Sequence, residues 1–323
     1  MALGVVGAVA AWPLPGFSQR QRRPRIGYLL LTPLTEPPSR ERQAFLDGLA
    51  EQGLVPGRTV DIVYRSAEGE ADFLEEASRD LLAQKPDVIA APGAPPVLAA
   101  LKTTRSVPIV MLAVGDPIGI GAVTSLAKPG GNVTGVSFLS SELAPKRLEY
   151  AKECVPNART MAAIWDRRNP NARAEADALV AAVGQQGLRM ESLGLASDAE
   201  LRRSLRRLSS ARPDLLYVAF EGGLAAANRT ALAQFALAQR IPLVSGWSSL
   251  TEAGGLLSYA PDIPSMFRRS AYYVARVLKG ARPENLPIEL PTTVELVVNS
   301  RTAQAIGVTL PPELLLRADR VIR

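Results

Sequence analysis

Small and polar residues follow the predicted strands of this chain, and they are the side chains best placed to bind a small molecule. They are Thr32, Thr35, Gly93, Ala94, Asp116 and Ser137 in the first half, and Asn169, Asn171, Glu221, Trp247 and Tyr259 in the second. Hydroxyl groups and the free N–H groups of helix N-termini can hold a carboxylate. Asp116 or Glu221 can hold an ammonium group, and Trp247 can cover an apolar portion or ring. The set predicts a site for a small zwitterion or polar acid.

Three of these residues have a structural explanation as well. Asp116 precedes Pro117 and fits a turn as well as a ligand contact. Asn169 precedes Pro170 and fits the N-cap of a helix equally well. Trp247 could lie in an ordinary core, but aromatic residues make up only 5% of the chain, and we favour a place in the pocket.

No combination of residues predicts catalysis. The chain has no histidine, which is the commonest general base and metal ligand. Its single cysteine, Cys154, excludes an internal disulfide and a cysteine-rich metal site. The glycines of Gly115–Gly121 lack the strand-to-helix spacing of a dinucleotide-binding turn. We therefore expect no catalytic residue, no metal and no cofactor, and an enzyme of doubly wound type is the less favoured alternative.

An internal repeat indicates how the candidate residues are positioned. A Pro-Asp pair, an apolar strand and a small loop occur at Pro86–Gly93 and again at Pro213–Gly222. A helix and a second apolar strand with an X-Pro start follow each copy, at Val107–Val114 and Ile241–Ser245. A continuous apolar run bounded by turn residues is typical of a parallel strand covered on both faces. The repeat predicts two similar α/β halves with a ligand between them.

The alternation of strands and helices predicts a two-lobed protein. Hairpin signals are missing, so we expect parallel sheets with helices on both faces and a site beyond the carboxyl ends of the strands. A chain of 323 residues suits two lobes better than one core. The expected lobes are residues 25–138 with 261–288, and residues 139–260 with 289–323. Three crossings between these Rossmann-like lobes, near Ser137, Pro261 and Glu289, would form a hinge.

The first 24 residues are predicted to be a signal peptide and leader. Met1–Phe17 is apolar, too short to span a membrane, and similar to the core of a secretory signal cut near Ser18. The basic start of such a signal is missing, and we favour a true start upstream of Met1. The net charge of +6 comes without a helix-turn-helix pattern or an aromatic-interleaved basic patch, so no nucleic-acid partner is expected.

Several motifs together resemble one family. They are Gly115-Asp-Pro, Lys128-Pro-Gly-Gly-Asn-Val-Thr-Gly-Val-Ser, Arg168-Asn-Pro-Asn, Leu257-Ser-Tyr-Ala-Pro, Pro291-Thr-Thr-Val-Glu-Leu-Val-Val-Asn and Leu310-Pro-Pro-Glu-Leu-Leu-Leu-Arg-Ala-Asp. In this order and spacing the chain resembles ABC transporter substrate-binding proteins of the tryptophan/tyrosine type, from Arg25 to Ile322. The resemblance implies a two-lobed periplasmic-binding-protein fold of type I that closes over a ligand.

The same resemblance implies the partners and the location. It implies an exported, periplasmic protein that delivers its ligand to an ABC permease in the membrane. We expect that ligand to be an aromatic amino acid or small organic acid, and the protein to be a monomer. A sensory module of the same fold that reports to a signalling partner is the first alternative. The run Asp166-Arg-Arg looks atypical for the family, and its two arginines favour, as a hypothesis, a more acidic ligand than a neutral amino acid.

Overall fold

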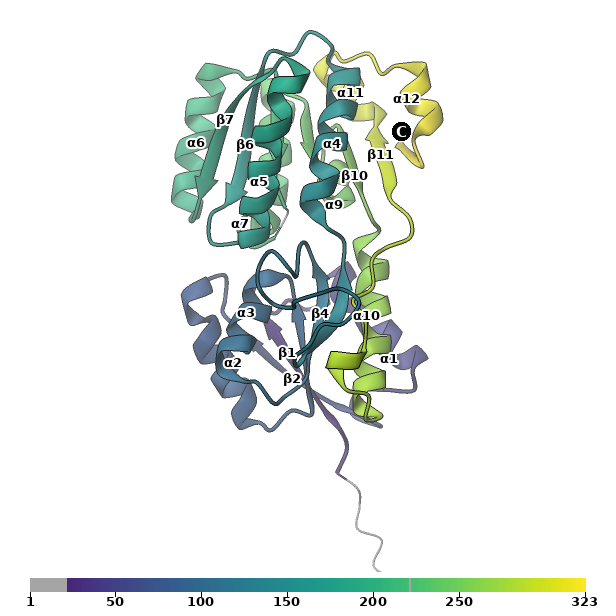
Figure 1. The fold of residues 1–323 in the computed structure, drawn as a ribbon. Coiled ribbons are helices and arrows are strands. Elements are labelled where there is room, and N and C mark those ends of the chain that lie inside the picture. Colours follow the sequence, from purple (N-terminus) through teal and green to yellow (C-terminus); the bar gives the residue numbers. More distant parts are fainter. Residues whose placement is uncertain (1–21, 221) are drawn as a thin grey trace, which may run out of the picture.

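The computed structural model describes residues 22–220 and 222–323 as two α/β lobes, one above the other (Figure 1). The predicted signal sequence Met1–Phe17 and the predicted ligand residue Glu221 lie outside the described residues. In the described part of the chain, no helix combines the length and the apolar character needed to cross a bilayer.

Lobe 1 is built on a five-stranded parallel sheet in the order β2-β1-β3-β4-β5. Its strands are β1 (Arg25–Leu30), β2 (Asp61–Ser66), β3 (Val88–Pro92), β4 (Ile109–Val114) and β5 (Val133–Ser137). Its helices are α1 (Arg40–Glu51), the 3-10 turn Ala71–Phe73 with α2 (Leu74–Ala83), α3 (Ala94–Thr103) and, from much later in the chain, α10 (Ile263–Leu278) with the 3-10 turn Pro283–Asn285. The amphipathic α10 packs against α1 and β4, which closes the core of this lobe.

Lobe 2 is built on a seven-stranded sheet in the order β12-β11-β10-β9-β8-β6-β7. Its strands are β6 (Thr160–Asp166), β7 (Arg189–Leu195), β8 (Leu215–Val218), β9 (Leu243–Ser245), β10 (Leu257–Ala260), β11 (Glu295–Asn299) and β12 (Arg320–Ile322). Its helices are α4 (Ser140–Cys154), α5 (Pro170–Val183) with the 3-10 turn Gly184–Gln186, α6 (Asp198–Ala211), α7 (Leu224–Ala227), α8 (Arg229–Gln239), α9 (Ser248–Glu252), α11 (Ser300–Ile306) and α12 (Pro312–Arg317).

The predicted internal repeat is present in the topology. The order β2-β1-β3-β4-β5 in lobe 1 matches β7-β6-β8-β9-β10 in lobe 2. The aspartates of the two Pro-Asp pairs have the same role: Asp87 accepts a hydrogen bond from the backbone N–H of Arg25 at 2.6 Å, and Asp214 accepts from those of Arg159 and Thr160 at 2.9 Å. In each lobe a carboxylate therefore fixes the start of the neighbouring central strand.

The last long strand differs from the expected all-parallel arrangement. Strand β11 pairs antiparallel with β10, whereas the other strand pairs of both sheets are parallel. The reason is the direction from which the chain returns: after β10 it passes into lobe 1 to form α10, and it re-enters lobe 2 from the junction between the lobes (Figure 1). A strand that starts at the junction must run opposite to one that ends there.

The chain passes between the lobes three times, from β5 to α4, from β10 to α10, and from the turn after α10 to β11. The first and third passages run side by side: Ser137 N–H donates to the carbonyl oxygen of Glu289 at 2.9 Å, and Glu289 N–H donates to that of Gly135 at 3.0 Å. These paired segments form the junction between the two lobes.

Candidate functional site

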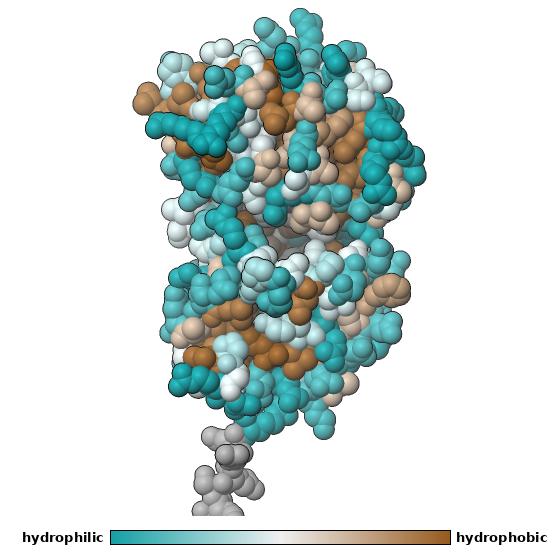
Figure 2. All heavy atoms as spheres, turned by 180° about the vertical axis from the view of Figure 1, so that it is seen from behind, coloured by the Kyte–Doolittle hydropathy of each residue, from teal (hydrophilic) through white to brown (hydrophobic). Residues whose placement is uncertain are grey.

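A cavity of about 530 Å³ lies between the lobes, within the size range of small-molecule sites. It is bounded by the carboxyl ends of β1 and β3 in lobe 1 and by the segments after β6, β8 and β9 in lobe 2. In both sheets this is the point where the strand order reverses, which is where open α/β sheets bind ligands. Figure 2 shows from behind the waist at which the two lobes meet.

Five of the predicted ligand residues line this cavity. They are Thr32, Thr35, Gly93, Asn169 and Trp247. Further side chains that the sequence pattern did not indicate also line it, among them Tyr28, Ser39, Glu41, Arg42, Arg229 and Phe267, and so does Phe220, which precedes the predicted ligand residue Glu221. Residues from both lobes therefore contribute to one site.

Aromatic rings form one wall of the cavity. Phe220 and Trp247 line it, with ring centroids 4.9 Å apart in an edge-to-face contact. Phe138, on the first passage between the lobes, stacks on Phe220 at 5.7 Å and contacts Trp247 at 5.5 Å. Phe220 has a φ of 49°, a left-handed conformation that costs roughly 1–2 kcal/mol for a residue with a side chain. The surrounding packing holds the ring in the wall in spite of this cost.

Polar side chains line the cavity between β1 and α1 of lobe 1. Arg42 is only 4% exposed, and its Nη2 donates to the carbonyl oxygen of Thr35 and, at 3.0 Å, to Glu36 Oε1. The Glu36 side chain is 76% exposed, so the carboxylate that pairs with this buried cation is itself in water. Ser39 caps α1 by accepting from the Arg42 N–H at 3.2 Å, which places the first turn of the helix against the cavity.

Tyr28, which lines the cavity, and Tyr64, which packs beside it, are neutral phenols. Burial raises the pKa of Tyr28 far above its ordinary value, and the neighbouring Tyr64 adds to the effect. Burial also raises the pKa of Tyr64, while the cationic Arg42, 5.8 Å from its ring centroid, lowers it in part. Both hydroxyl groups stay protonated at neutral pH, so the positive charge of Arg42 is not cancelled by a phenolate.

Helix α3 presents apolar rings at a place where free N–H groups were expected. Gly93 precedes the helix with a φ of 75°, and Pro95 and Pro96 follow Ala94. Proline has no backbone N–H, so two of the donors of this helix N-terminus are missing. Pro95 and Pro96 instead line the cavity, and Ala94 is fully buried behind them.

Asn169, Asn171 and Asp116 meet where the lobes touch. Asn169 caps α5 by accepting from the Asn171 N–H at 3.0 Å, and it also lines the cavity. Asn171 Oδ1 accepts from the backbone N–H of Asp116 in the other lobe at 3.1 Å, and its buried Nδ2 has no hydrogen-bond partner among the described residues. Asp116 Oδ1 accepts from the N–H groups of Ile118 and Gly119, so this carboxylate shapes the turn that the sequence allowed.

Ser137 and Tyr259 lie outside the lining of the cavity. Ser137 is fully buried at the end of β5, where its N–H pairs with the third passage between the lobes. Tyr259 packs edge-to-face on Tyr150 of α4, with centroids 5.2 Å apart, and its carbonyl accepts from Arg147 Nε at 2.7 Å. Both residues lie at the ends of strands as predicted, but their side chains belong to the structure around the junction.

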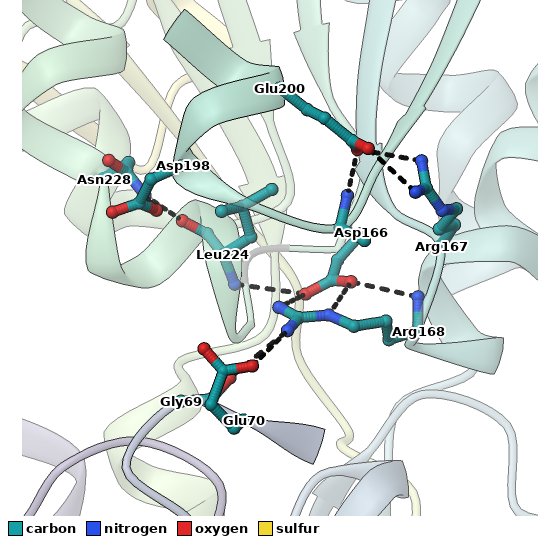
Figure 3. Close-up of polar contacts among 10 residues, drawn as sticks. Gly69, Glu70, Asp166, Arg167, Arg168, Asp198, Glu200, Leu224 and Asn228 are labelled. Atoms are coloured by element: carbon teal, nitrogen blue, oxygen red, sulfur yellow. Dashed lines mark hydrogen bonds and ion pairs between the residues drawn. The ribbon is translucent and has the colours of Figure 1, made fainter. Parts of the chain in front are cut away.

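The two arginines of the Asp166-Arg-Arg run do not point into the cavity. Arg167 pairs with Glu200 through both terminal nitrogens, at 2.8 and 2.9 Å, and Arg168 pairs with Asp166 (Figure 3). Their charges are compensated by carboxylates, so the structure gives no support to the hypothesis that they select an acidic ligand. The buried cation that lines the cavity is Arg42, in a helix rather than a loop.

Arg42 was not predicted from the sequence, for an identifiable reason. The predicted ligand residues come directly after strands, and Arg42 comes a whole loop later, in the first turn of α1. The one feature of the sequence that could have indicated Arg42 is its position just after the Ser39 cap. The first turn of a helix at the carboxyl ends of the strands faces the site. Phe220 lies in the segment Phe220-Glu221-Gly222 after a predicted strand, in which the charged Glu221 is the predicted ligand residue.

Comparison with known proteins gives consistent results. A family model described as ABC transporter substrate binding protein matches residues 34–322. A curated relative named tyrosine-binding protein, from Clostridioides difficile strain R20291, is 25% identical over 279 residues, which cover 85% of this chain and 79% of the relative.

Solved structures share the whole architecture. An ABC domain from Streptococcus pneumoniae in complex with L-Trp is 27% identical, with a TM-score of 0.84 over 93% of this chain and 100% of that chain. A conserved domain protein from Vibrio cholerae O1 biovar El Tor is 25% identical, with a TM-score of 0.85 and the same coverage. The two lobes have the fold of type I periplasmic binding proteins. With most of its length matched, this chain belongs to the family of ABC transporter substrate-binding proteins, which bind ligands and are not enzymes.

Proposed function

We propose that this protein is the extracytoplasmic receptor of an ABC importer and binds a small aromatic carboxylate, such as an aromatic amino acid, between its lobes. The observation that carries the proposal is the pairing of two unlike walls. Phe220 and Trp247 offer ring faces and edges, and Arg42 with Thr32 and Thr35 offers a cation and hydroxyl groups.

The charge of Arg42 argues for an anionic group on the ligand. A charge removed from water is costly unless it is paired and hydrogen-bonded. Arg42 is almost fully buried, and its ion-pair partner Glu36 is mostly in water. A ligand carboxylate in the cavity would compensate the charge of the guanidinium on its buried side. Arginine binds carboxylates in a planar, bidentate geometry, which favours such a pair.

The aromatic wall argues for a ring at the other end of the ligand. Phe220 and Trp247 of lobe 2 line the cavity, and lobe 1 contributes Phe267 and, in place of N–H donors, the rings of Pro95 and Pro96. Aromatic pairs gain about 0.5–1.5 kcal/mol beyond the area they bury. The names of two relatives, tyrosine-binding protein and an L-Trp complex, support a ligand with a ring and a carboxylate.

Transport follows from the family and from the two-lobed fold. The lobes, taken as residues 25–138 with 261–288 and residues 139–260 with 289–323, would close over the ligand by bending the three passages between them. The closed form would then deliver its cargo to a membrane permease from the periplasmic side. Export rests on the predicted leader in residues 1–24.

The test is calorimetric titration of protein freed of carried-over ligand by unfolding and refolding. The panel holds L-tryptophan, L-tyrosine, benzoate, tryptamine and L-tryptophan amide, so that the carboxylate is present in three ligands and removed or neutralised in two. We expect ligands with both a ring and a carboxylate to bind, and tryptamine and the amide to bind at least tenfold more weakly. Equal binding of tryptamine and tryptophan would refute the role given to the carboxylate, and silence of the whole panel would refute the proposed ligand class.

A further inference from the structure

Arg168, in the turn between β6 and α5, forms several hydrogen bonds with one buried carboxylate (Figure 3). The carboxylate of Asp166 is 2% exposed and accepts from Arg168 at the backbone N–H, Nε and Nη2, each at 3.0 Å. It also accepts from the backbone N–H of Leu224 at 3.2 Å. The hydrogen bond to Asp166 raises the pKa of Arg168, against the effect of burial. Asp166 therefore fixes the orientation of the Arg168 guanidinium from within lobe 2.

The remaining nitrogen of this guanidinium reaches the other lobe. Arg168 Nη1 donates to the carbonyl oxygen of Gly69 at 3.3 Å and lies 3.8 Å from Glu70 Oε2. Gly69 and Glu70 follow β2 of lobe 1. Gly69 has a φ of 93°, and its N–H donates to the carbonyl oxygen of Leu31 at 2.7 Å. Leu31 lines the cavity, so Arg168 connects lobe 2 to a segment that is tied to the cavity wall of lobe 1.

The neighbouring arginine makes no such connection. Arg167 donates to Glu200 and to the carbonyl oxygen of Gly194 at 3.0 Å, and all of these groups belong to lobe 2. Two adjacent arginines of equal charge therefore differ in one respect: the contacts of Arg168 cross the cleft, and those of Arg167 remain within one lobe (Figure 3).

We propose that Arg168 is a positioning residue that holds the lobes together over the bound ligand and thereby slows ligand release. This inference rests on the proposed function, because it needs a ligand that is held by closure. The contacts to Gly69 and Glu70 exist only when the lobes meet, so their loss affects the closed state alone. Recognition of the ligand by the open protein does not involve Arg168, which is absent from the cavity lining.

Loss of the Arg168 contacts should change the rate constant of ligand release. The contacts across the cleft are one partly exposed ion pair and one hydrogen bond, and their loss should accelerate release by roughly three- to thirtyfold and leave association unchanged. Because the contact to Glu70 is exposed to solvent, raising the salt concentration should accelerate release from the wild type more than from the variant.

The experiment is stopped-flow measurement of association and release with L-tyrosine, L-tryptophan and benzoate as probes. The variants are Arg168→Ala, the matched control Arg167→Ala, and Arg168→Lys. Lysine keeps the charge but cannot bond Asp166 and Gly69 together, so its release rate should be intermediate. Thermal unfolding without ligand checks that each variant is folded.

A second variant on the opposite lobe separates bridging from local folding of the turn. Glu70→Gln leaves the Asp166–Arg168 pair intact, so a faster release in this variant, and a smaller effect of Arg168→Ala in its background, would support the bridge. If Arg168→Ala and Arg167→Ala release a bound probe at the wild-type rate, the inference fails and the proposed function stands. If the wild-type protein binds no probe, the proposed function fails and this inference with it.

Discussion

Gly115 of lobe 1 lies directly against the ring of Phe220 in lobe 2. A Cβ atom at position 115 would be 2.6 Å from Phe220 Cε2, closer than such atoms approach in proteins, and 3.0 Å from Asn171 Cγ, which is a tight contact. The close approach of the lobes at this edge of the cavity therefore requires a residue without a side chain. The requirement applies to the closed arrangement, because both contacts come from the other lobe.

Gly115→Ala should weaken ligand binding and leave the unliganded fold unchanged. Overpacking of a tight contact costs about 1–3 kcal/mol, and here the cost falls on the closed state, so affinity should drop by roughly 5- to 150-fold. Calorimetric titration and thermal unfolding without ligand measure the two quantities. Gly131→Ala is the control, since a Cβ atom at position 131 would meet nothing within 4 Å. Wild-type affinity in Gly115→Ala would show that the close contact is not needed for binding.

Arg42→Gln should lower affinity for ligands with a carboxylate much more than for their amides. A hydrogen bond to a charged group contributes about 1.5–3 kcal/mol, which corresponds to roughly 10- to 150-fold in affinity. L-tryptophan and L-tryptophan amide, titrated against both proteins, measure the difference. The exposed Arg79, paired with Glu75 on α2, provides the control Arg79→Gln. An equal loss for acid and amide would mean that Arg42 only supports the loop that carries Thr35.

Trp247 should report ligand binding by its fluorescence. It lines the cavity, whereas Trp165 lies beside Arg173 and donates from its indole N–H to Ser192 at 2.9 Å. Benzoate adds no indole of its own, so its binding should change the emission of the wild type and of Trp165→Phe, but not of Trp247→Phe. A change in emission that persists in Trp247→Phe and disappears in Trp165→Phe would mean that benzoate binds outside this cavity.

The repeat and the cleft could be predicted because their signals are local. The Pro-Asp pairs, the apolar strands and the turn residues are each decided within a few residues, and Asp87 and Asp214 occupy matching positions as a result. The direction of β11 could not be predicted in this way. It depends on the place from which the chain re-enters lobe 2, and no residue of the strand encodes that place.

In the candidate site, too, local features could be predicted from the sequence and features set by tertiary contacts could not. The residues at the end of each strand were found, but which of them face the cavity depends on how the lobes meet. Asn169 does and Tyr259 does not, although both lie near the end of a strand and precede a proline by one or two positions. Arg168 was expected to influence the ligand by charge, and a buried Asp166 turns it toward Gly69 instead. Pairings of this kind are set by tertiary contacts rather than by spacing.

The buried pair Arg147–Glu175 should be a weak point for single substitutions in lobe 2. Both side chains are 0% exposed and 2.8 Å apart, and Tyr217 donates to the same Glu175 Oε1 at 2.8 Å. Arg147→Met leaves an unpaired buried carboxylate and should destabilise the protein by about 3–5 kcal/mol. Arg147→Met with Glu175→Leu removes both charges and should recover most of that loss. Denaturant unfolding of the wild type, both single variants and the double variant checks this; additive effects of the two substitutions would contradict it.

Glu252 should give the protein a measurable sensitivity to acid. Its pKa is lowered below the ordinary value of 4.5: burial alone would raise it, but the hydrogen bond from Arg320 and the charges of Arg40 and Arg320 outweigh that effect. A carboxyl group whose pKa is lower in the folded state stabilises the fold at pH values above 4.5, and the contribution is lost as the pH falls through the folded-state pKa. Glu252→Gln should therefore be less stable than the wild type at pH 7.

The difference between these two proteins should shrink as the pH falls below 4.5, where Glu252 becomes protonated and resembles the glutamine. Urea unfolding of both proteins at pH 7, 5 and 3.5 measures it. Arg40 belongs to lobe 1 and Arg320 to lobe 2, at 2.8 and 2.7 Å from Glu252. The acid effect should therefore extend to ligand binding through the contact with Arg40, and Arg40→Gln should remove that part while leaving the contribution of Arg320 to stability. A stability difference that stays constant from pH 7 to pH 3.5 would contradict the assigned pKa direction.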